Sequence, residues 1–393
     1  MTSGSAREVL AAFLKLGLTS FGGPIAHIGY LRREFVERRE WVDDGQFAQL
    51  LALSQFLPGP ASSQLGFCLG LLRAGWAGAL AAFVAFTLPS AVLLFAFAAA
   101  LPYVANGAGE SAIHGLKLVA VAVVAQGVLG MARQLCPDAP RATIAAVALA
   151  LVLASAQAWM QIVVVVLGGL AGLALRRDVQ AVTGSFRPPY GIRLGWALIA
   201  VFMLLLFGLP LAAHAGGGLV AVVEAFYRAG ALVFGGGHVV LPLLRETVVA
   251  SGWISDDVFL AGYGAAQAVP GPMFTFAAYL GARLPGSEGG LLGATVALLA
   301  IFLPGFLLVA GALPLWRSIA SRAVAVRAVA GVNAAVVGLL GAALYDPVWT
   351  SAVHGPLDVA IAVVAFTLLV AWRASALVVV LWCVAAALAV SLA

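Results

Sequence analysis

Charged residues are scarce in this sequence. Only 9% of the 393 residues are Asp, Glu, Lys or Arg, whereas soluble domains contain about 25%. Hydrophobic residues account for 63%, and apolar runs of roughly 20 residues, enough for a helix to cross a bilayer, recur along the chain. We therefore predict an all-α polytopic membrane protein. The net charge of +5 comes from loop arginines, which orient a chain in the lipid bilayer, and it does not indicate nucleic acid as a partner.

Carboxylates are almost absent from the apolar runs, and Glu224 and Asp346 lie at segment boundaries. A path for metal cations needs buried carboxylates, and an enzyme needs a nucleophile–base or acid–base pair. Neither is visible, so we predict that the protein is not an enzyme. Cys68, Cys136 and Cys383 form no CxxC pair, which predicts neither a disulfide framework nor a metal site. The phosphate-binding motif GxxxxGK followed by Ser or Thr is also absent, and no cofactor is predicted.

Two helix-breaking stretches interrupt the apolar runs. The first is Pro58-Gly59-Pro60, inside the run 44–72, and the second is Pro270-Gly271-Pro272. Proline fixes φ and removes a backbone donor, while glycine lets the chain turn, so neither stretch can continue an α-helix. At membrane depth such a break persists only where protein or a water-filled cavity satisfies the freed backbone groups. Two such breaks in matching sequence surroundings indicate a site.

The surroundings of the breaks reveal an internal repeat. Residues 13–23, which end in Phe-Gly-Gly, align with residues 226–236, which end in the same three residues. Pro89 likewise falls on Pro304 in the following apolar run. Self-similarity of this kind indicates repeated structural units. We predict an N-terminal repeat at 1–175, a cytoplasmic linker plus one inverting transmembrane helix at 176–215, and a C-terminal repeat at 216–393.

Loop arginines predict the orientation of these repeats, because cytoplasmic loops are enriched in Lys and Arg. With the 176–193 linker in the cytoplasm and the run 44–72 re-entrant, nearly every loop arginine is cytoplasmic, while Arg245 and Arg283 lie outside. The extra span at 194–213 then inverts the second repeat relative to the first. Whether the first apolar run of each repeat spans or re-enters stays open at this point. The cytoplasmic set is Arg32, Arg33, Arg38, Arg39, Arg73, Arg133, Arg141, Arg176, Arg177, Arg187, Arg193, Arg317, Arg322, Arg327 and Arg373.

Inverted repeats with broken helices near the bilayer midplane are typical of secondary transporters. The helix after each break would begin with free N–H groups and the positive end of its dipole, which suit an anion. Hydroxyls and amides add donors, and a cation inside an apolar run indicates function. The predicted substrate-binding residues are Lys15, Gly22, Gly23, Gln55, Pro58, Gly59, Pro60, Ser62, Ser63, Arg228, Gly235, Gly236, His238, Gln267, Pro270, Gly271, Pro272 and Thr275.

Each of these assignments has a structural alternative. The breaks could be plain kinks whose hydroxyls bond back to the preceding turn, and Lys15 and Arg228 could reach lipid headgroups instead. His238, like His27, could carry a proton or cap a broken helix, and capping is favoured. Three other histidines lie near loops and are predicted to be solvated, namely His114, His214 and His354.

The motifs Phe-Gly-Gly-Pro-Ile-Ala-His at 21–27 and Leu-Pro-Gly-Pro at 57–60, with their copies at 234–238 and 269–272, resemble the chromate ion transporter family in its long two-domain form. The resemblance covers nearly the whole chain. It implies a multi-pass protein of the bacterial inner membrane that exports chromate, with sulfate as a structural analogue of the substrate. Short members of this family act in pairs, and a homodimer is compatible with the resemblance. The second copy departs from the first at Gly237, which replaces Pro24.

We therefore predict a secondary transporter of oxyanions, chromate above all, that works by alternating access between the repeats. Transport of sulfate or another oxyanion is the alternative within this class. An anion channel, an intramembrane enzyme and a receptor-like scaffold are the alternatives from other classes. The sequence fixes neither the direction of transport nor the coupling ion.

Overall fold

A computed structural model describes residues 4–21, 23–104, 108–155, 160–174, 188–234, 239–316 and 322–392. Within these ranges the chain is helical and has no strand. The first repeat contains α1 (Ala6–Thr19), α2 (Gly23–Arg32), η1 (Arg33–Arg38), α3 (Asp44–Phe56), α4 (Ala61–Val104), α5 (Ala108–Leu135), α6 (Ala139–Ser155) and α7 (Met160–Leu173), and α8 (Ile192–Gly216) follows it. The second contains α9 (Gly218–Leu232), α10 (Val240–Val248), α11 (Asp256–Ala268), η3 (Met273–Thr275), α12 (Phe276–Ala282), η4 (Gly286–Glu288), α13 (Gly290–Ala312), η5 (Leu313–Leu315), α15 (Ala323–Ala343), η6 (Leu344–Trp349), α16 (Thr350–Ala352), α17 (Pro356–Val370) and α18 (Ala376–Leu392).

Several helices are long and apolar enough to cross a membrane, which confirms the predicted multi-pass α-helical class. In the described part of the chain there are five such segments: Ala61–Tyr103, Gly109–Leu135, Ile192–Gly216, Gly290–Leu315 and Ala323–Ala352. Helix α8 exposes most of its apolar surface, including Leu204, Phe207 and Leu211. An apolar face of this size is unfavourable in water and fits a lipid environment.

The first apolar run, whose path the sequence left open, is broken in the structure. Helix α1 has 14 residues and α2 has 10, and each is shorter than the roughly 20 residues that a membrane-spanning helix needs. The second apolar run is broken as well, because α3 ends at Phe56 and α4 begins at Ala61. The predicted broken helices are therefore present in the first repeat.

Helix α4 is in fact a tight helical hairpin, because its backbone leaves helical geometry at Ala74 and Gly75. The two limbs cross so closely that a Cβ on Gly70 would lie 2.4 Å from the carbonyl oxygen of Gly78. The second repeat contains the matching contact between α12 and α13, where a Cβ on Gly281 would lie 2.2 Å from the carbonyl oxygen of Gly293. Both repeats thus use glycine to bring a short helix after the break against a long helix.

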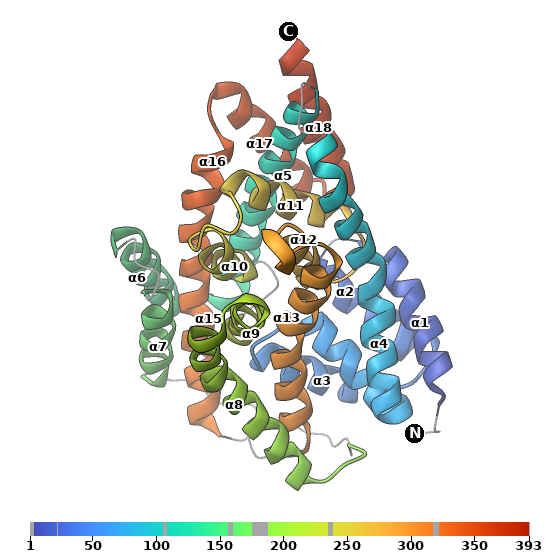
Figure 1. Ribbon diagram of the computed structural model, residues 1–393. Helices are drawn as coiled ribbons and strands as arrows, with labels where there is room; N and C mark the ends of the chain where they lie inside the picture. Colours follow the sequence, from blue (N-terminus) through green and yellow to red (C-terminus); the bar gives the residue numbers. More distant parts are fainter. Residues whose placement is uncertain are drawn as a thin grey trace.

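Corresponding helices of the two repeats run in opposite directions (Figure 1). The long limb of α4 and its counterpart α13 point opposite ways along the long axis of the molecule, and so do α5 and α15. This arrangement is the inverted topology that the loop arginines predict.

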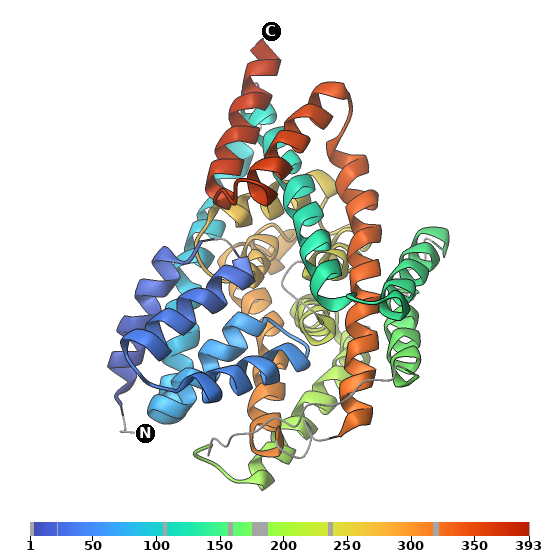
Figure 2. The same cartoon turned by 180° about the vertical axis from the view of Figure 1, so that it is seen from behind.

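The repeats also interlock. Helix α5 of the first repeat packs against α17 and α18 of the second, while α15 of the second packs against α6 and α7 of the first (Figure 2). Glycines make these crossings close: a Cβ on Gly115 would lie 2.7 Å from the Cα of Val384, and one on Gly338 would lie 2.1 Å from the carbonyl oxygen of Ala145. The last helices of each repeat are thus exchanged between the two.

Candidate functional site

The first Pro-Gly-Pro break lies against the end of α9 in the other repeat. Helix α3 has a capping box at Asp43 and ends at Phe56, and the backbone of the next residue, Leu57, is extended. Gly59 has a φ of +122°, a conformation that residues with a Cβ rarely adopt. Its N–H donates to the carbonyl oxygen of Val233 at 2.7 Å. We call this contact between residues 57–60 and Val233 the first crossing.

The second Pro-Gly-Pro break makes the reciprocal contact. Gly271 has a φ of +103°, and its N–H donates to the carbonyl oxygen of Ser20, just after α1, at 2.9 Å. We call this contact between residues 269–272 and Ser20 the second crossing. Ser20 and Val233 each precede a Phe-Gly-Gly motif. Each Pro-Gly-Pro break is therefore bonded to the chain that leads into the glycine break of the opposite repeat.

The long helices α13 and α4 contact the two crossings. In each helix the contact residue directly follows a proline. A Cβ on Gly59 would lie 3.0 Å from the Cα of Gly305, which follows Pro304 in α13. A Cβ on Gly271 would lie 2.8 Å from the Oγ of Ser90, which follows Pro89 in α4. Only glycine leaves room for these approaches.

A chain of phenylalanines joins the two crossings. Phe67, in the short limb of α4, stacks on Phe306 with ring centroids 4.7 Å apart. Phe306 stacks on Phe302 at 5.7 Å, and Phe302 meets Phe274, just after the second break, at 5.6 Å. The two crossings are therefore connected by an apolar line of aromatic rings.

Several polar atoms beside the crossings are buried without a partner. Such groups are costly, since each one has lost its hydrogen bonds to water. In the described part of the chain the unpaired atoms near the breaks are Ser20 Oγ, His27 Nδ1, Ser63 Oγ, Gln64 Oε1, Thr87 Oγ1 and Gln267 Nε2. The hydroxyls and the Gln267 amide can donate to an anion. Ser62, next to Ser63, is also buried.

Other polar groups at the breaks bond within the protein. Gln64 Nε2 donates to the carbonyl oxygens of Pro58 at 2.8 Å and Gly305 at 2.9 Å, which ties the first crossing to α13. Thr275 Oγ1 donates to the carbonyl oxygen of Pro272 at 2.6 Å, the local bond that the kink alternative expects. His27 Nε2 lies 3.1 Å from the carbonyl oxygen of Ser20, in agreement with a capping role.

Three predicted residues are not among these buried groups. Lys15 is exposed, and so is Gln55 in the last turn of α3 just before the first crossing. Arg228 Nε pairs with Glu224 Oε1 at 2.7 Å, and Arg228 lines a cavity of about 550 Å³ among α7, α9, α10 and α15 together with Gln161 and Thr247. The structure thus does not bring the two predicted cations to the breaks. Pro58, Gly59, Pro60, Ser62, Ser63, Gln267, Pro270, Gly271, Pro272 and Thr275 are at the crossings or in the adjacent helical turns.

Gly23 begins α2 with a φ of +75°, and Gly22, Gly235, Gly236 and His238 lie outside the described residues.

The sequence analysis did not identify four polar residues beside the crossings, namely Ser20, Gln64, Thr87 and Ser90. The available signal was their position: Ser20 precedes the glycine break, Gln64 lies in the first turns after the first Pro-Gly-Pro, and Thr87 and Ser90 flank Pro89.

Comparison with known proteins identifies the family. A family profile described as "Chromate transporter" matches residues 7–173 and again residues 220–390. The chain belongs to the chromate transporter family. The double match agrees with the internal repeat found in the sequence.

Three relatives with printed names align with most of this chain. It is 30% identical to a protein of Pseudomonas aeruginosa named "Chromate transport protein", over 86% of this chain and 80% of the relative. It is 29% identical to a protein of the same name in Cupriavidus metallidurans, over 86% and 81%. It is 27% identical to a "Probable chromate transport protein" of Synechococcus elongatus, over 86% and 84%. These names describe transporters. No solved structure matches the chain.

Proposed function

We propose that this chain exports chromate across the bacterial inner membrane and holds the anion at the two crossings. The names of the relatives support chromate as the substrate. The observation that carries the location is the reciprocal pair of hydrogen bonds, Gly59 to Val233 and Gly271 to Ser20, with unpaired buried donors beside both.

Chromate is a tetrahedral dianion that needs several donors at once. The short limb of α4 begins at Ala61 directly after the first break, and the first N–H groups of a helix have no partner within it. These groups and the positive end of the helix dipole favour an anion. Ser63 and Gln267 add donors whose hydrogen bonds become charge-assisted when chromate is bound.

The described part of the crossings contains no lysine or arginine. A site built from neutral donors binds a dianion less tightly than one with fixed cations, and this favours release after the conformational change. The membrane potential then assists outward movement, because an inside-negative potential of 100 mV contributes about 2.3 kcal/mol per charge, or about 4.6 kcal/mol for two charges.

The inverted arrangement supplies a route for alternating access. In transporters with inverted repeats, one repeat rocks against the other around a fixed site. Here the two equivalent backbone bonds would break in turn, so that the first crossing opens toward one side while the second stays closed. The interlocked helices α5 and α15 would keep the repeats together during this motion.

Expression of the chain in a chromate-sensitive bacterium tests the proposed function. Cells with the protein in their membrane should accumulate less chromate than cells with an equal amount of a Gly271→Leu variant, whose side chain fills the second crossing. Equal accumulation in the two strains would contradict the proposal. Inside-out vesicles should take up chromate, which tests the direction.

Sulfate is the second candidate substrate, because it presents the same tetrahedral dianion to the same donors. Competition in vesicles separates the two substrates. If chromate is preferred, a tenfold excess of sulfate should leave most chromate uptake intact. Flux that does not saturate with substrate would indicate an anion channel instead.

A further inference from the structure

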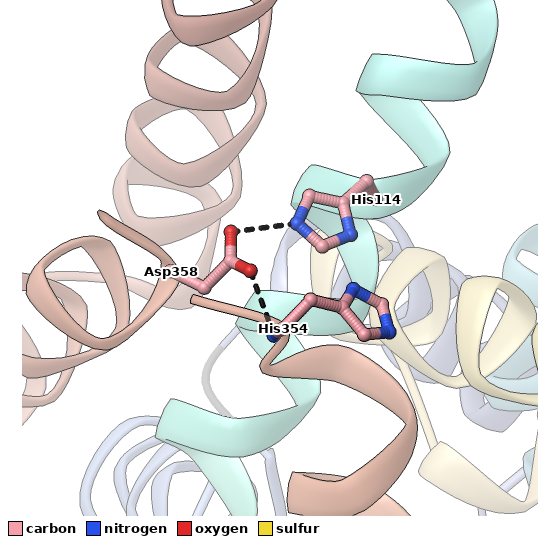
Figure 3. A group of neighbouring side chains, drawn as sticks. All are labelled: His114, His354 and Asp358. Atoms are coloured by element: carbon pink, nitrogen blue, oxygen red, sulfur yellow. Dashed lines mark hydrogen bonds and ion pairs between the residues drawn. The ribbon is translucent and has the colours of Figure 1, made fainter. Parts of the chain in front are cut away.

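His114 lies beside His354 and Asp358, two residues from a distant part of the sequence (Figure 3). His114 lies near the start of α5, His354 precedes α17, and Asp358 lies in the first turn of α17. His114 Nε2 lies 2.7 Å from Asp358 Oδ1. The two imidazole rings are stacked with centroids 5.5 Å apart and an angle of 22° between their planes.

One ligand atom from each residue can be chosen so that all three lie within 4.8 Å of one another. The chain holds the group in place from several directions. The backbone N–H of His354 donates to Asp358 Oδ2 at 2.9 Å, which fixes the carboxylate relative to the loop. Gly115, next to His114, packs directly on the backbone of α18. The Asp358 side chain is only 15% exposed and that of His114 is 28% exposed.

We propose that His114, His354 and Asp358 form a binding site for a divalent transition metal such as Zn²⁺. Imidazole nitrogens with one carboxylate suit Zn²⁺ and its neighbours in the first transition row, whereas Mg²⁺ and Ca²⁺ prefer oxygen ligands alone. Three protein ligands leave a further coordination position for water. The second carboxylate oxygen, held by the His354 N–H, orients the ligand in the way that outer-sphere hydrogen bonds do at known sites.

A local hydrogen bond alone does not account for the whole arrangement. The local hydrogen bond at the start of α17 uses the Asp358 carboxylate and the His354 N–H, and neither imidazole is needed for it. The stacked position of the His354 ring over His114 adds a second nitrogen ligand beside the carboxylate. Ligation of a metal ion uses a ring nitrogen lone pair of each imidazole.

The site joins the two repeats, because His114 comes from the first and the other two ligands come from the second. A metal bound to the native fold stabilises it by an amount that grows with metal concentration. Bound Zn²⁺ therefore ties α5 to the start of α17 and should raise the melting temperature of the protein. This inference does not depend on the transported substrate.

Zinc titration of the purified full chain in detergent, without a histidine tag, tests the proposal. We expect wild-type protein to bind one Zn²⁺ per chain at this site, and His354→Gln and Asp358→Asn to weaken binding at least about tenfold. The matched control is His214→Gln, since His214 is exposed at the end of α8, and it should bind as wild type does. Zn²⁺ should raise the melting temperature of wild type and of this control, and not that of His354→Gln.

His354 is exposed, so its substitution should leave the fold intact, and Asn at position 358 keeps an oxygen for the His354 N–H. An unchanged elution profile and unchanged melting without Zn²⁺ would verify this. Absence of saturable Zn²⁺ binding to wild type, or equal binding by wild type and His354→Gln, would overturn the proposal.

Discussion

The first and second crossings share one backbone geometry and differ in their side chains. In the first, Gln64 donates two hydrogen bonds that tie the break to α13. In the second, the aligned position holds Phe276, and the nearby Thr275 bonds only to its own turn. Each buried hydrogen bond contributes about 0.5–1.5 kcal/mol. The first crossing is therefore held more firmly, and we expect the second to open more readily.

The glycines of the breaks should give the largest effects. Gly59→Ala and Gly271→Ala each place a Cβ against packed atoms at a positive φ, and the strain alone is about 1–3 kcal/mol. We expect both variants to lose most chromate transport in vesicles containing equal amounts of protein. The control is Gly75→Ala, which has a φ of +64° but no atom within 4 Å of the new Cβ. Equal loss in all three variants would show that strain, and not the crossing, is responsible.

The next largest effect should come from Gln64. Gln64→Leu removes one buried and one partly buried hydrogen bond and should lower the free energy of unfolding by about 1–3 kcal/mol. Amide hydrogen exchange offers a direct measure, because local opening sets its rate. In wild type the Gly271 amide should exchange faster than the Gly59 amide, and in Gln64→Leu the difference should shrink. Slower exchange at Gly271 than at Gly59 in wild type would contradict the expectation that the second crossing opens more readily than the first.

The same substitution at the glutamine before the second break, Gln267→Leu, should weaken chromate binding and leave the stability of the protein unchanged. The Gln267 Nε2 atom has no partner among the described residues, so its removal breaks no bond within them. We expect the KM for chromate to rise severalfold, with the melting temperature unchanged. Ser63→Ala should behave in the same way. A fall in stability with an unchanged KM would show that both side chains stabilise the fold and do not bind chromate.

The smallest effect should come from Lys15. Its side chain is exposed on α1 and contributes no buried donor to the crossings, so Lys15→Gln should change transport by less than about twofold, as exposed substitutions commonly do. Arg228→Gln should have a somewhat larger effect because it leaves Glu224 unpaired beside the cavity. Transport assays at two salt concentrations check both. Loss of transport in Lys15→Gln would contradict this prediction and would show that Lys15 is part of the substrate-binding site.

The breaks, the repeat and the inversion could be predicted because each depends on local chemistry. Proline and glycine stop a helix wherever they occur, and loop arginines report orientation without knowledge of packing. The pairing of each Pro-Gly-Pro with the opposite glycine break could not be predicted, since it depends on how the helices pack in three dimensions. The same reason explains why the sequence did not show that the Lys15 side chain is exposed, and why Gln64 and Thr87 were missed.

A structure of the chain with bound chromate, located by the anomalous scattering of chromium, tests the central claim most directly. The account predicts that the anion lies at the crossings, within hydrogen-bonding distance of at least one of Ser63 and Gln267. Chromate bound instead in the cavity beside Arg228, with both crossings closed and empty, would contradict it.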